Sequence, residues 1–223
     1  ISGEKRAELI KEDPKSAEII RPILRGRDIK RYGYEFADLY LICTFPSKHY
    51  DIEKYPAIKK HLLSFGMEKL EQSGKTYIKN GEKIKSRKKT TNKWFETQDS
   101  IAYSDLFLEQ KIIYAELVQG PKFYLDNENY FISNTGYIMN GSDLDVLIKY
   151  LNSLTVSILF KKYYSTGMGE TGFRFLKQYL ELLPIPKSKS EILLNAENDN
   201  EIEEIICKIY NLSDMEQNYI FSK

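Results

Sequence analysis

A series of short strand-like segments, separated by tight turns, most constrains how this chain can fold. Residues 111–118 (KIIYAELV) form the most apolar of them, and residues 93–97, 122–125, 130–133 and 136–140 have similar character. The segments are separated by Gln119-Gly120-Pro121, Asp126-Asn127 and Asn134-Thr135-Gly136, residue types that favour turns. Residues 38–45 (DLYLICTF) form a further apolar run, typical of a buried strand, that ends at Pro46. The short connections predict a mostly antiparallel sheet between residues 38 and 140.

Helical patterns lie on both sides of these segments. Apolar residues at helical spacing predict helices over residues 4–13, 51–66, 142–151, 154–164 and 173–182, and over 197–210 and 213–220 near the C-terminus. We therefore predict an α+β fold with a central, mostly antiparallel sheet, packed helices and a helical C-terminal segment. Residues 1–187 would form one domain, and residues 188–223 an acidic helical tail.

Composition excludes several classes of protein. The chain has 223 residues, of which 42% are hydrophobic and 29% charged, with 12 Gly and 7 Pro, so it is neither collagen-like nor wholly disordered. No apolar run reaches the length of a membrane span, and the N-terminal segment lacks the apolar stretch of a secretory signal. We expect a cytoplasmic protein with no membrane partner. Two Cys and two His are too few for a disulfide framework or a metal cluster.

Charge is distributed unevenly along the chain. Residues 69–93 contain nine basic and two acidic side chains, a net charge of +7, whereas residues 191–223 carry −6. A basic block of this kind indicates a polyanionic partner, because Lys and Arg displace counterions from phosphates. The alternative is a solvated loop in a protein with 26 Lys and 7 Arg. The candidates for DNA contact in or beside this block are Lys83, Lys85, Arg87, Lys88, Lys89 and Lys93.

Arginine is the scarcer cation, and four of the seven fall between Arg21 and Arg31. Arg25 and Arg27 flank Gly26 in a predicted turn, and guanidinium groups suit bidentate contact with phosphate or guanine. A structural role, with Asp28 as the partner, is the favoured alternative. Arg174 and Lys177 follow a glycine-rich turn over residues 166–172, and we expect them to contact the DNA backbone at the start of a helix.

No catalytic constellation occurs in the sequence. The G-x-S-x-G, phosphate-loop and G-x-G-x-x-G motifs are all missing. Cys43 lies in an apolar segment and is expected to pack in the core, as is one of Trp94 and Phe95, although a base-stacking role for Trp94 is the alternative. Glu203 and Glu204 are expected on a solvated helix face. We therefore predict no catalytic, cofactor-binding or metal-binding residues in this chain, which alone would be no enzyme.

Three stretches together resemble one family. They are residues 20–32 (IRPILRGRDIKRY), residues 55–62 (YPAIKKHL), and a third set that runs from KIIY at 111–114 through NTGY at 134–137, LNS at 151–153 and FLKQYL at 175–180 to LPIP at 183–186. In this order and spacing they resemble the TaqI-like C-terminal specificity domain of adenine-specific DNA methyltransferases and fused restriction-modification enzymes. The resemblance covers residues 19–187 and implies that residues 1–187 form a DNA target-recognition domain.

The resemblance implies a division of labour. In the family, a separate N-terminal Rossmann-like domain binds S-adenosylmethionine and carries an Asn-Pro-Pro-Tyr type tetrapeptide that holds a flipped adenine, while the specificity domain reads the double-stranded DNA. The present chain has no Asn-Pro pair. We therefore expect it to be the DNA-reading part of a longer protein, with that methyltransferase domain as its partner and S-adenosylmethionine as the cofactor of the parent.

The chain departs from the family pattern at two places, and two alternative functions stay open. Where relatives often have an arginine, this chain has Leu70-Glu71-Gln72 and Trp94-Phe95-Glu96-Thr97-Gln98, so those contacts are expected to differ here. The alternatives are a specificity subunit of a type I restriction-modification system and a protein-interaction module that docks through the acidic tail.

Overall fold

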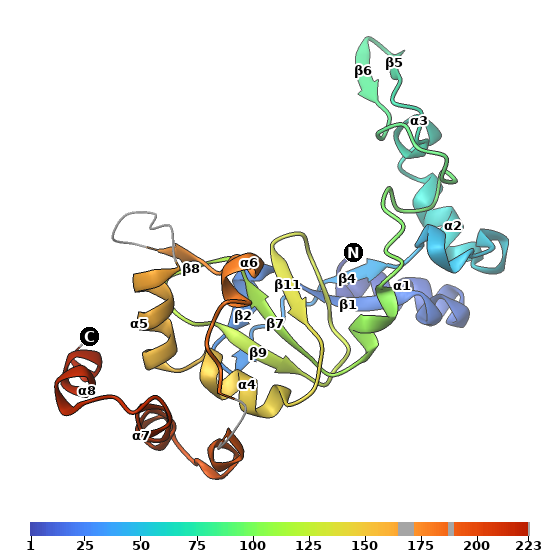
Figure 1. Cartoon of the computed structure of the whole chain (residues 1–223). Helices are drawn as coiled ribbons and strands as arrows, with labels where there is room; N and C mark the ends of the chain where they lie inside the picture. The colour runs from blue at the N-terminus through green and yellow to red at the C-terminus, as the bar shows by residue number, and fades with distance from the viewer. Residues whose placement is uncertain (165–171, 187–189, 223) are drawn as a thin grey trace. The chain divides into compact units, whose positions relative to one another are not determined.

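The computed structural model describes residues 1–164, 172–186 and 190–222. They form two compact units, each with its own hydrophobic core (Figure 1). Unit 1 comprises Ile1–Ile23 and Asp38–Phe107, and unit 2 comprises Leu24–Ala37 and Leu108–Lys223. The predicted boundary near residue 187 falls within unit 2, and as a functional boundary it stays a prediction.

Unit 1 is mostly helical around a short strand pair. Strand β1 (Ile20–Leu24) pairs antiparallel with β4 (Tyr40–Ile42). The helices are α1 (Gly3–Glu12), α2 (Pro56–Leu63) and α3 (Met67–Leu70), with 3-10 turns at Pro14–Glu18, Pro46–Lys48, Ile52–Lys54 and Ser104–Leu108. Ser2 caps α1 and Pro56 opens α2, which are favoured residue types at these positions. Leu9, Ile19, Ile52, Ile58 and Phe95 are buried together in its core.

A two-stranded hairpin extends from α3 of unit 1. It consists of β5 (Thr76–Lys79) and β6 (Glu82–Lys85). The hairpin and the segment that follows it contain the basic block of the sequence (Figure 1, green at upper right).

Unit 2 is built on a three-stranded antiparallel sheet in the order β11-β7-β9. Its strands are β7 (Lys111–Ala115), β9 (Phe123–Asp126) and β11 (Gly136–Met139). Smaller strands are β2 (Ile29–Lys30), β3 (Gly33–Tyr34), β8 (Leu117–Val118), β10 (Phe131–Ile132) and β12 (Phe173–Arg174). The helices are α4 (Leu144–Leu151), α5 (Leu154–Tyr163), α6 (Lys177–Leu180), α7 (Asp199–Ile209) and α8 (Asp214–Phe221), with a 3-10 turn at Ser190–Asn195.

The core of unit 2 explains why β7 is the most apolar strand of the sequence. All five of its residues are buried, and α4 packs against the sheet. Lys111 begins the strand, and its buried ammonium group pairs with the buried carboxylate of Asp126 on β9. Asp126 also accepts hydrogen bonds from the backbone amides of Glu128 and Tyr130, so this buried charge pair is satisfied.

The α+β fold class, its antiparallel pairings and its C-terminal helices agree with the prediction, but three details of the prediction are wrong. First, the strands form several small sheets rather than one sheet over residues 38–140. Second, residues 93–97 form no strand, because side chains of Gln72 and Arg87 bind the carbonyls of Lys93, Trp94 and Glu96 that a sheet would have used. Third, the helix expected over 173–182 is shorter, because Phe173 and Arg174 pair with β8 before α6 begins.

Candidate nucleic-acid interface

The β5–β6 hairpin has a fixed register. Asn80 and Gly81 form its two-residue turn, and both have positive φ angles, 52° and 81°. This is the geometry of the turn that best matches the twist of paired strands. Across the hairpin, Thr76 lies opposite Lys85 and Ile78 opposite Lys83, and these four side chains share one face because side chains alternate along a strand.

The opposite face of the hairpin, here called the inner face, contacts the rest of unit 1. Tyr77 and Ile84 lie opposite each other and are half-buried. Lys79 forms an ion pair with Glu68 of α3, with an Nζ–Oε1 distance of 2.7 Å. A hydrogen bond to Glu71 raises the pKa of Tyr77. These contacts determine which face of the hairpin is directed away from the protein.

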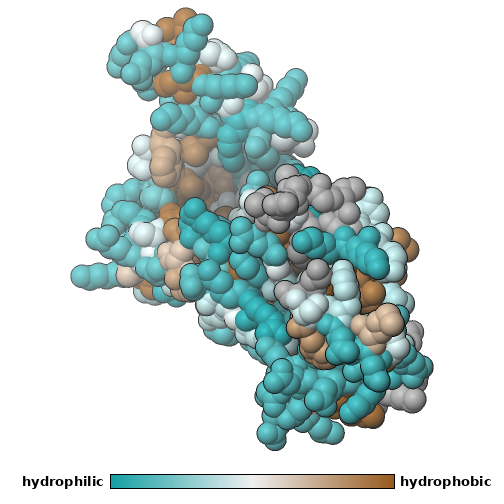
Figure 2. Space-filling view, turned by 90° about the vertical axis from the view of Figure 1, so that its left-hand side faces the viewer, coloured by the Kyte–Doolittle hydropathy of each residue, from teal (hydrophilic) through white to brown (hydrophobic). Residues whose placement is uncertain are grey.

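The outer face is exposed and cationic. Lys83, Lys85, Ile78 and Thr76 are all exposed on it, and Lys88 and Lys89 are exposed in the segment that follows. Within the described part of the chain, none of these four lysines forms an ion pair. The space-filling view shows mostly hydrophilic residues, with hydrophobic residues among them at the top, where the hairpin lies (Figure 2). A two-stranded ribbon of this kind fits the major groove of B-DNA.

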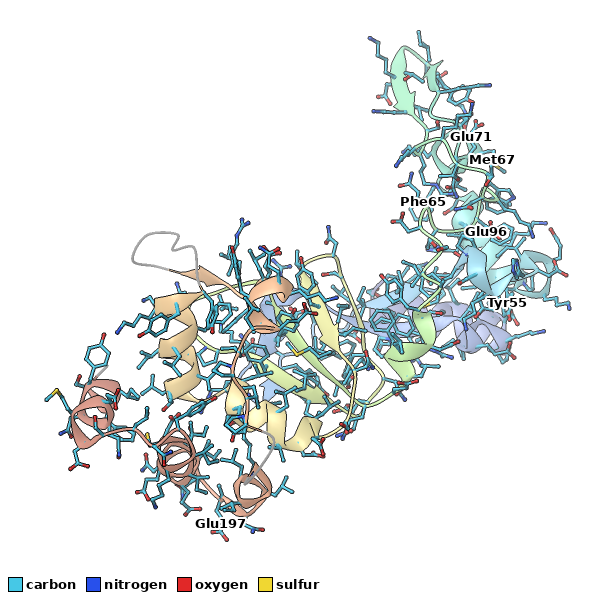
Figure 3. The ribbon with its side chains drawn as sticks, viewed as in Figure 1. Tyr55, Phe65, Met67, Glu71, Glu96 and Glu197 are labelled. Atoms are coloured by element: carbon cyan, nitrogen blue, oxygen red, sulfur yellow. The ribbon has the colours of Figure 1, made fainter. Side chains whose placement is uncertain are left out.

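Arg87 holds the base of the hairpin rather than projecting from it. Its guanidinium group donates hydrogen bonds to the backbone carbonyls of Leu70, Trp94 and Glu96, with an Nε–O distance of 2.7 Å to Leu70. Burial lowers its pKa. The backbone amide of Arg87 also donates to the carbonyl of Glu71, and both Glu71 and Glu96 are labelled below the hairpin in Figure 3. Among the predicted candidates of the basic block, Arg87 therefore has a structural role in this structure.

The neighbouring residues of the segment 86–97 are ordered by similar contacts. The buried side chain of Gln72 donates to the carbonyls of Lys93 and Glu96 and accepts from Thr90. Lys93 is exposed, and its ammonium group lies 5.6 Å from the centroid of the Phe95 ring. Trp94 packs, partly buried, against the core of unit 1, so core packing rather than an exposed stacking platform describes it.

The arginine cluster of the sequence separates into structural members and one exposed member. Arg25 binds Asp28 through two nitrogens, with Nη2–Oδ1 at 2.8 Å and Nε–Oδ2 at 2.9 Å. Arg31 pairs with Asp199 of α7 and donates to the carbonyl of Asn152. Arg27, in contrast, is exposed, and among the described residues it forms no ion pair. The favoured structural alternative is thus confirmed for Arg25 but not for Arg27.

Arg27 lines a cavity of about 580 Å³ in unit 2. Lys122, Gln119 and Thr135 also line it, together with backbone at Gly26 and Gly172. Gly26 is needed here because a Cβ atom would lie 2.4 Å from the Thr135 carbonyl oxygen. No carboxylate lines the cavity in the part of the chain that the structure describes, so its two cations make it attractive to an anion.

Arg174 and Lys177 are exposed, and each forms a long ion pair with one glutamate. Arg174 lies opposite Leu117 in the β8–β12 pair, and its guanidinium group is 3.5 Å from the Glu116 carboxylate. Lys177 begins α6 and lies 3.6 Å from Glu181. Most of the glycine-rich turn that precedes them, residues 166–171, is outside the described residues. Their contact with DNA stays a prediction.

The acidic tail is bound to unit 2 rather than freely solvated. The carboxylate of Glu203 is buried and accepts hydrogen bonds from the backbone amides of Leu154 and Thr155 and from the Thr155 hydroxyl at 2.8 Å. The prediction of a solvated face is therefore wrong for Glu203, because its carboxylate caps the N-terminus of α5. Asp199 is likewise paired with Arg31.

The structure also locates the side chains that could be reactive or bind a metal. Cys43 is buried, and burial raises the pKa of its thiol to about 12, which suppresses the reactive thiolate. Among the described residues, no three His, Cys, Asp or Glu side chains converge as metal ligands do. None of the helices in the described ranges combines the length and the hydropathy needed to cross a bilayer.

Two features of the candidate interface were missed in the sequence. Asn80-Gly81 between alternating segments is a strong hairpin signal that would have placed Ile78, Lys83 and Lys85 on one face. Lys122 carries no local signal, because the fold brings it to Arg27 from a distant part of the sequence.

Comparison with known proteins adds one finding. The family model of the TaqI-like C-terminal specificity domain matches residues 21–185. No curated protein matches the chain. The matched range includes the hairpin, Arg27 with its cavity, and Arg174.

Proposed function

Because this chain belongs to the TaqI-like C-terminal specificity domain family, we propose that it reads the sequence of duplex DNA and positions the duplex for adenine methylation by another domain of a restriction-modification enzyme. The family itself indicates DNA sequence recognition in the context of restriction and modification. Adenine as the methylated base and a methyltransferase domain as the partner belong to the proposal.

The observation that carries the proposal is the outer face of the β5–β6 hairpin. A ribbon that presents Lys83 and Lys85 without acidic partners, and that is held in one orientation by its inner face, is suited to a polyanion. A solvated loop would need neither the fixed turn nor the packed base around Arg87. The order of the basic segment therefore favours a binding role over a merely solvated one.

In this mechanism, positioning and reading are separate tasks. Lysines of the hairpin contact phosphates and fix the register of the protein on the duplex, which is independent of sequence. Base edges in the major groove supply the sequence information. In unit 2, Arg27 offers a guanidinium group whose planar fork suits phosphate or guanine, and Lys122 adds a second charge to the same cavity.

Methyl transfer would take place in the partner domain. S-adenosylmethionine supplies the methyl group there, and the target base must leave the helix to reach it. In this proposal the cofactor binds to the partner domain, and no residue of the present chain is assigned to it. The proposed contribution of this chain is to bind the duplex and to hold it while the base is extracted.

Binding to a short fluorescent duplex, measured by anisotropy at several salt concentrations, tests the proposal. We expect binding at low salt and a linear decrease of log affinity with log salt concentration. No binding by this chain, nor by the full-length protein, at low salt would overturn it. For the finer part, the full-length protein with labelled S-adenosylmethionine should yield N6-methyladenine, and label found only in cytosine would refute adenine as the target.

A further inference from the structure

Ile78 is an exposed apolar side chain on the cationic outer face, near the turn of the hairpin. Its exposed fraction is 76%, although isoleucine is among the residues most often found inside proteins. Lys83 lies directly opposite it, and Thr76 and Lys85 share its face. A single exposed apolar residue needs no explanation by itself. The position of Ile78 directly opposite Lys83 and diagonal to Lys85, two cations that form no ion pair with the described residues, is what calls for one.

The hairpin does not bury Ile78 against the rest of unit 1. Its register places Tyr77 and Ile84 on the inner face, where they are half-buried, and the Lys79–Glu68 ion pair secures that face to α3. Moving Ile78 inward would require a one-residue slip of β5, which would expose Tyr77 instead. The tight Asn80-Gly81 turn opposes such a slip.

The neighbours of Ile78 indicate what could cover it. If Lys83 and Lys85 on β6 contact the phosphates along one side of a groove, Ile78 on the neighbouring strand and the same face is directed into the groove, toward the base edges. In the major groove the apolar group that a base pair presents is the C5-methyl group of thymine. A branched aliphatic side chain without donors or acceptors can bury that methyl group but cannot read a polar edge.

We propose that Ile78 contacts a thymine methyl group in the major groove and thereby contributes sequence discrimination at one A·T pair. This inference rests on the proposed function. Burial of one methyl group corresponds to about a fourfold change in affinity. This contribution to affinity is smaller than that of the phosphate contacts. Unlike the phosphate contacts, it depends on the DNA sequence.

The test replaces single thymines by deoxyuridine, which removes only the methyl group. A duplex is first selected from a random library with the wild-type chain, and each thymine is then exchanged in turn. We expect one position at which wild type loses about fourfold in affinity. Ile78→Ala should bind the thymine duplex about fourfold more weakly and should no longer distinguish thymine from uracil at that position.

Controls separate this inference from the proposed function. Ile192→Ala, at an isoleucine that is 53% exposed in unit 2, should keep the full thymine preference. Circular dichroism verifies that Ile78→Ala is folded, as expected for an exposed position. If wild type binds DNA but shows no methyl-sensitive thymine, or if Ile78→Ala retains the preference, the inference fails and the proposed function stands. If wild type binds no duplex at low salt, both fail.

Discussion

Neutralising the outer face of the hairpin should weaken DNA binding in a way that salt dependence can quantify. In Lys83→Gln/Lys85→Gln, two exposed ammonium groups that have no ion pair within the described chain are removed. Each phosphate contact contributes about 0.9 to the slope of log affinity against log salt concentration, so the slope should become shallower by about 1.8. At about 0.1 M salt the same arithmetic predicts a loss of about sixtyfold in affinity.

The assay is anisotropy with one labelled duplex across a range of salt concentrations. Lys11→Gln/Lys54→Gln is a matched control, since these lysines are also exposed in unit 1 but lie outside the hairpin. It changes the net charge equally and should leave the slope within experimental error. Because phosphate contacts carry no base information, the ratio of affinities for selected and random duplexes should be similar in wild type and the hairpin variant. An unchanged slope in the hairpin variant, or an equal change in the control, would refute the assignment of Lys83 and Lys85 to phosphates.

Three further predictions concern groups that stabilise the interior of one unit each. Arg87→Met removes the Arg87 donor from the carbonyls of Leu70, Trp94 and Glu96, of which Glu96 still accepts from Gln72, and should lower the free energy of unfolding of unit 1 by about 2 to 3 kcal/mol. Arg87→Lys should restore the charge but not the stability, measured by urea denaturation. Glu203→Ala removes the acceptor from the amides of Leu154 and Thr155 and should lower the free energy of unfolding of unit 2 by about 1 to 3 kcal/mol. Glu204→Ala, at an exposed neighbour, should lower it by less than about 0.5 kcal/mol. Asp28→Asn should destabilise unit 2 by about 1 to 3 kcal/mol at neutral pH. Burial opposes ionisation of Asp28, but hydrogen bonds from the Arg25 side chain and backbone amide outweigh burial and lower its pKa below 3.8. The ionised Asp28 therefore stabilises wild type above about pH 4, and this stabilisation is lost as the pH falls through the lowered pKa. The difference in free energy of unfolding between wild type and Asp28→Asn should shrink over that range. A difference that stays constant with pH would contradict this account.

The parts of the fold that local pattern determines could be predicted from the sequence. The apolar run of β7 and the turns around β9 and β11 were sufficient for an antiparallel sheet, because short connections leave few other pairings. Ser153 was recognisable only as part of a family motif, yet the structure gives the motif a physical reason. Ser153 caps α5, and the side chain of the preceding Asn152 forms two hydrogen bonds with the backbone of Phe123.

Local sequence pattern could not predict which distant side chains bind the backbone carbonyls and amides of a segment. Residues 93–97 alternate as a strand does, but Arg87 and Gln72 bind their carbonyls first, and no spacing rule reports that. Glu203 looks solvated beside Glu204 until α5 brings unpaired amides to it. For the same reason, charge counting identified the basic block but could not separate Arg87, which holds the hairpin, from Lys83 and Lys85, which project from it.

The most direct test of the central claim is a lysine footprint of the complex. The full chain is acetylated at low salt with and without saturating duplex DNA, and the modification at each lysine is measured by mass spectrometry. If the outer face of the hairpin contacts DNA, Lys83, Lys85, Lys88 and Lys89 should be protected while Lys11 and Lys54 react equally in both samples. Equal modification of the four hairpin lysines with and without DNA, under conditions where anisotropy shows the duplex bound, would contradict the account.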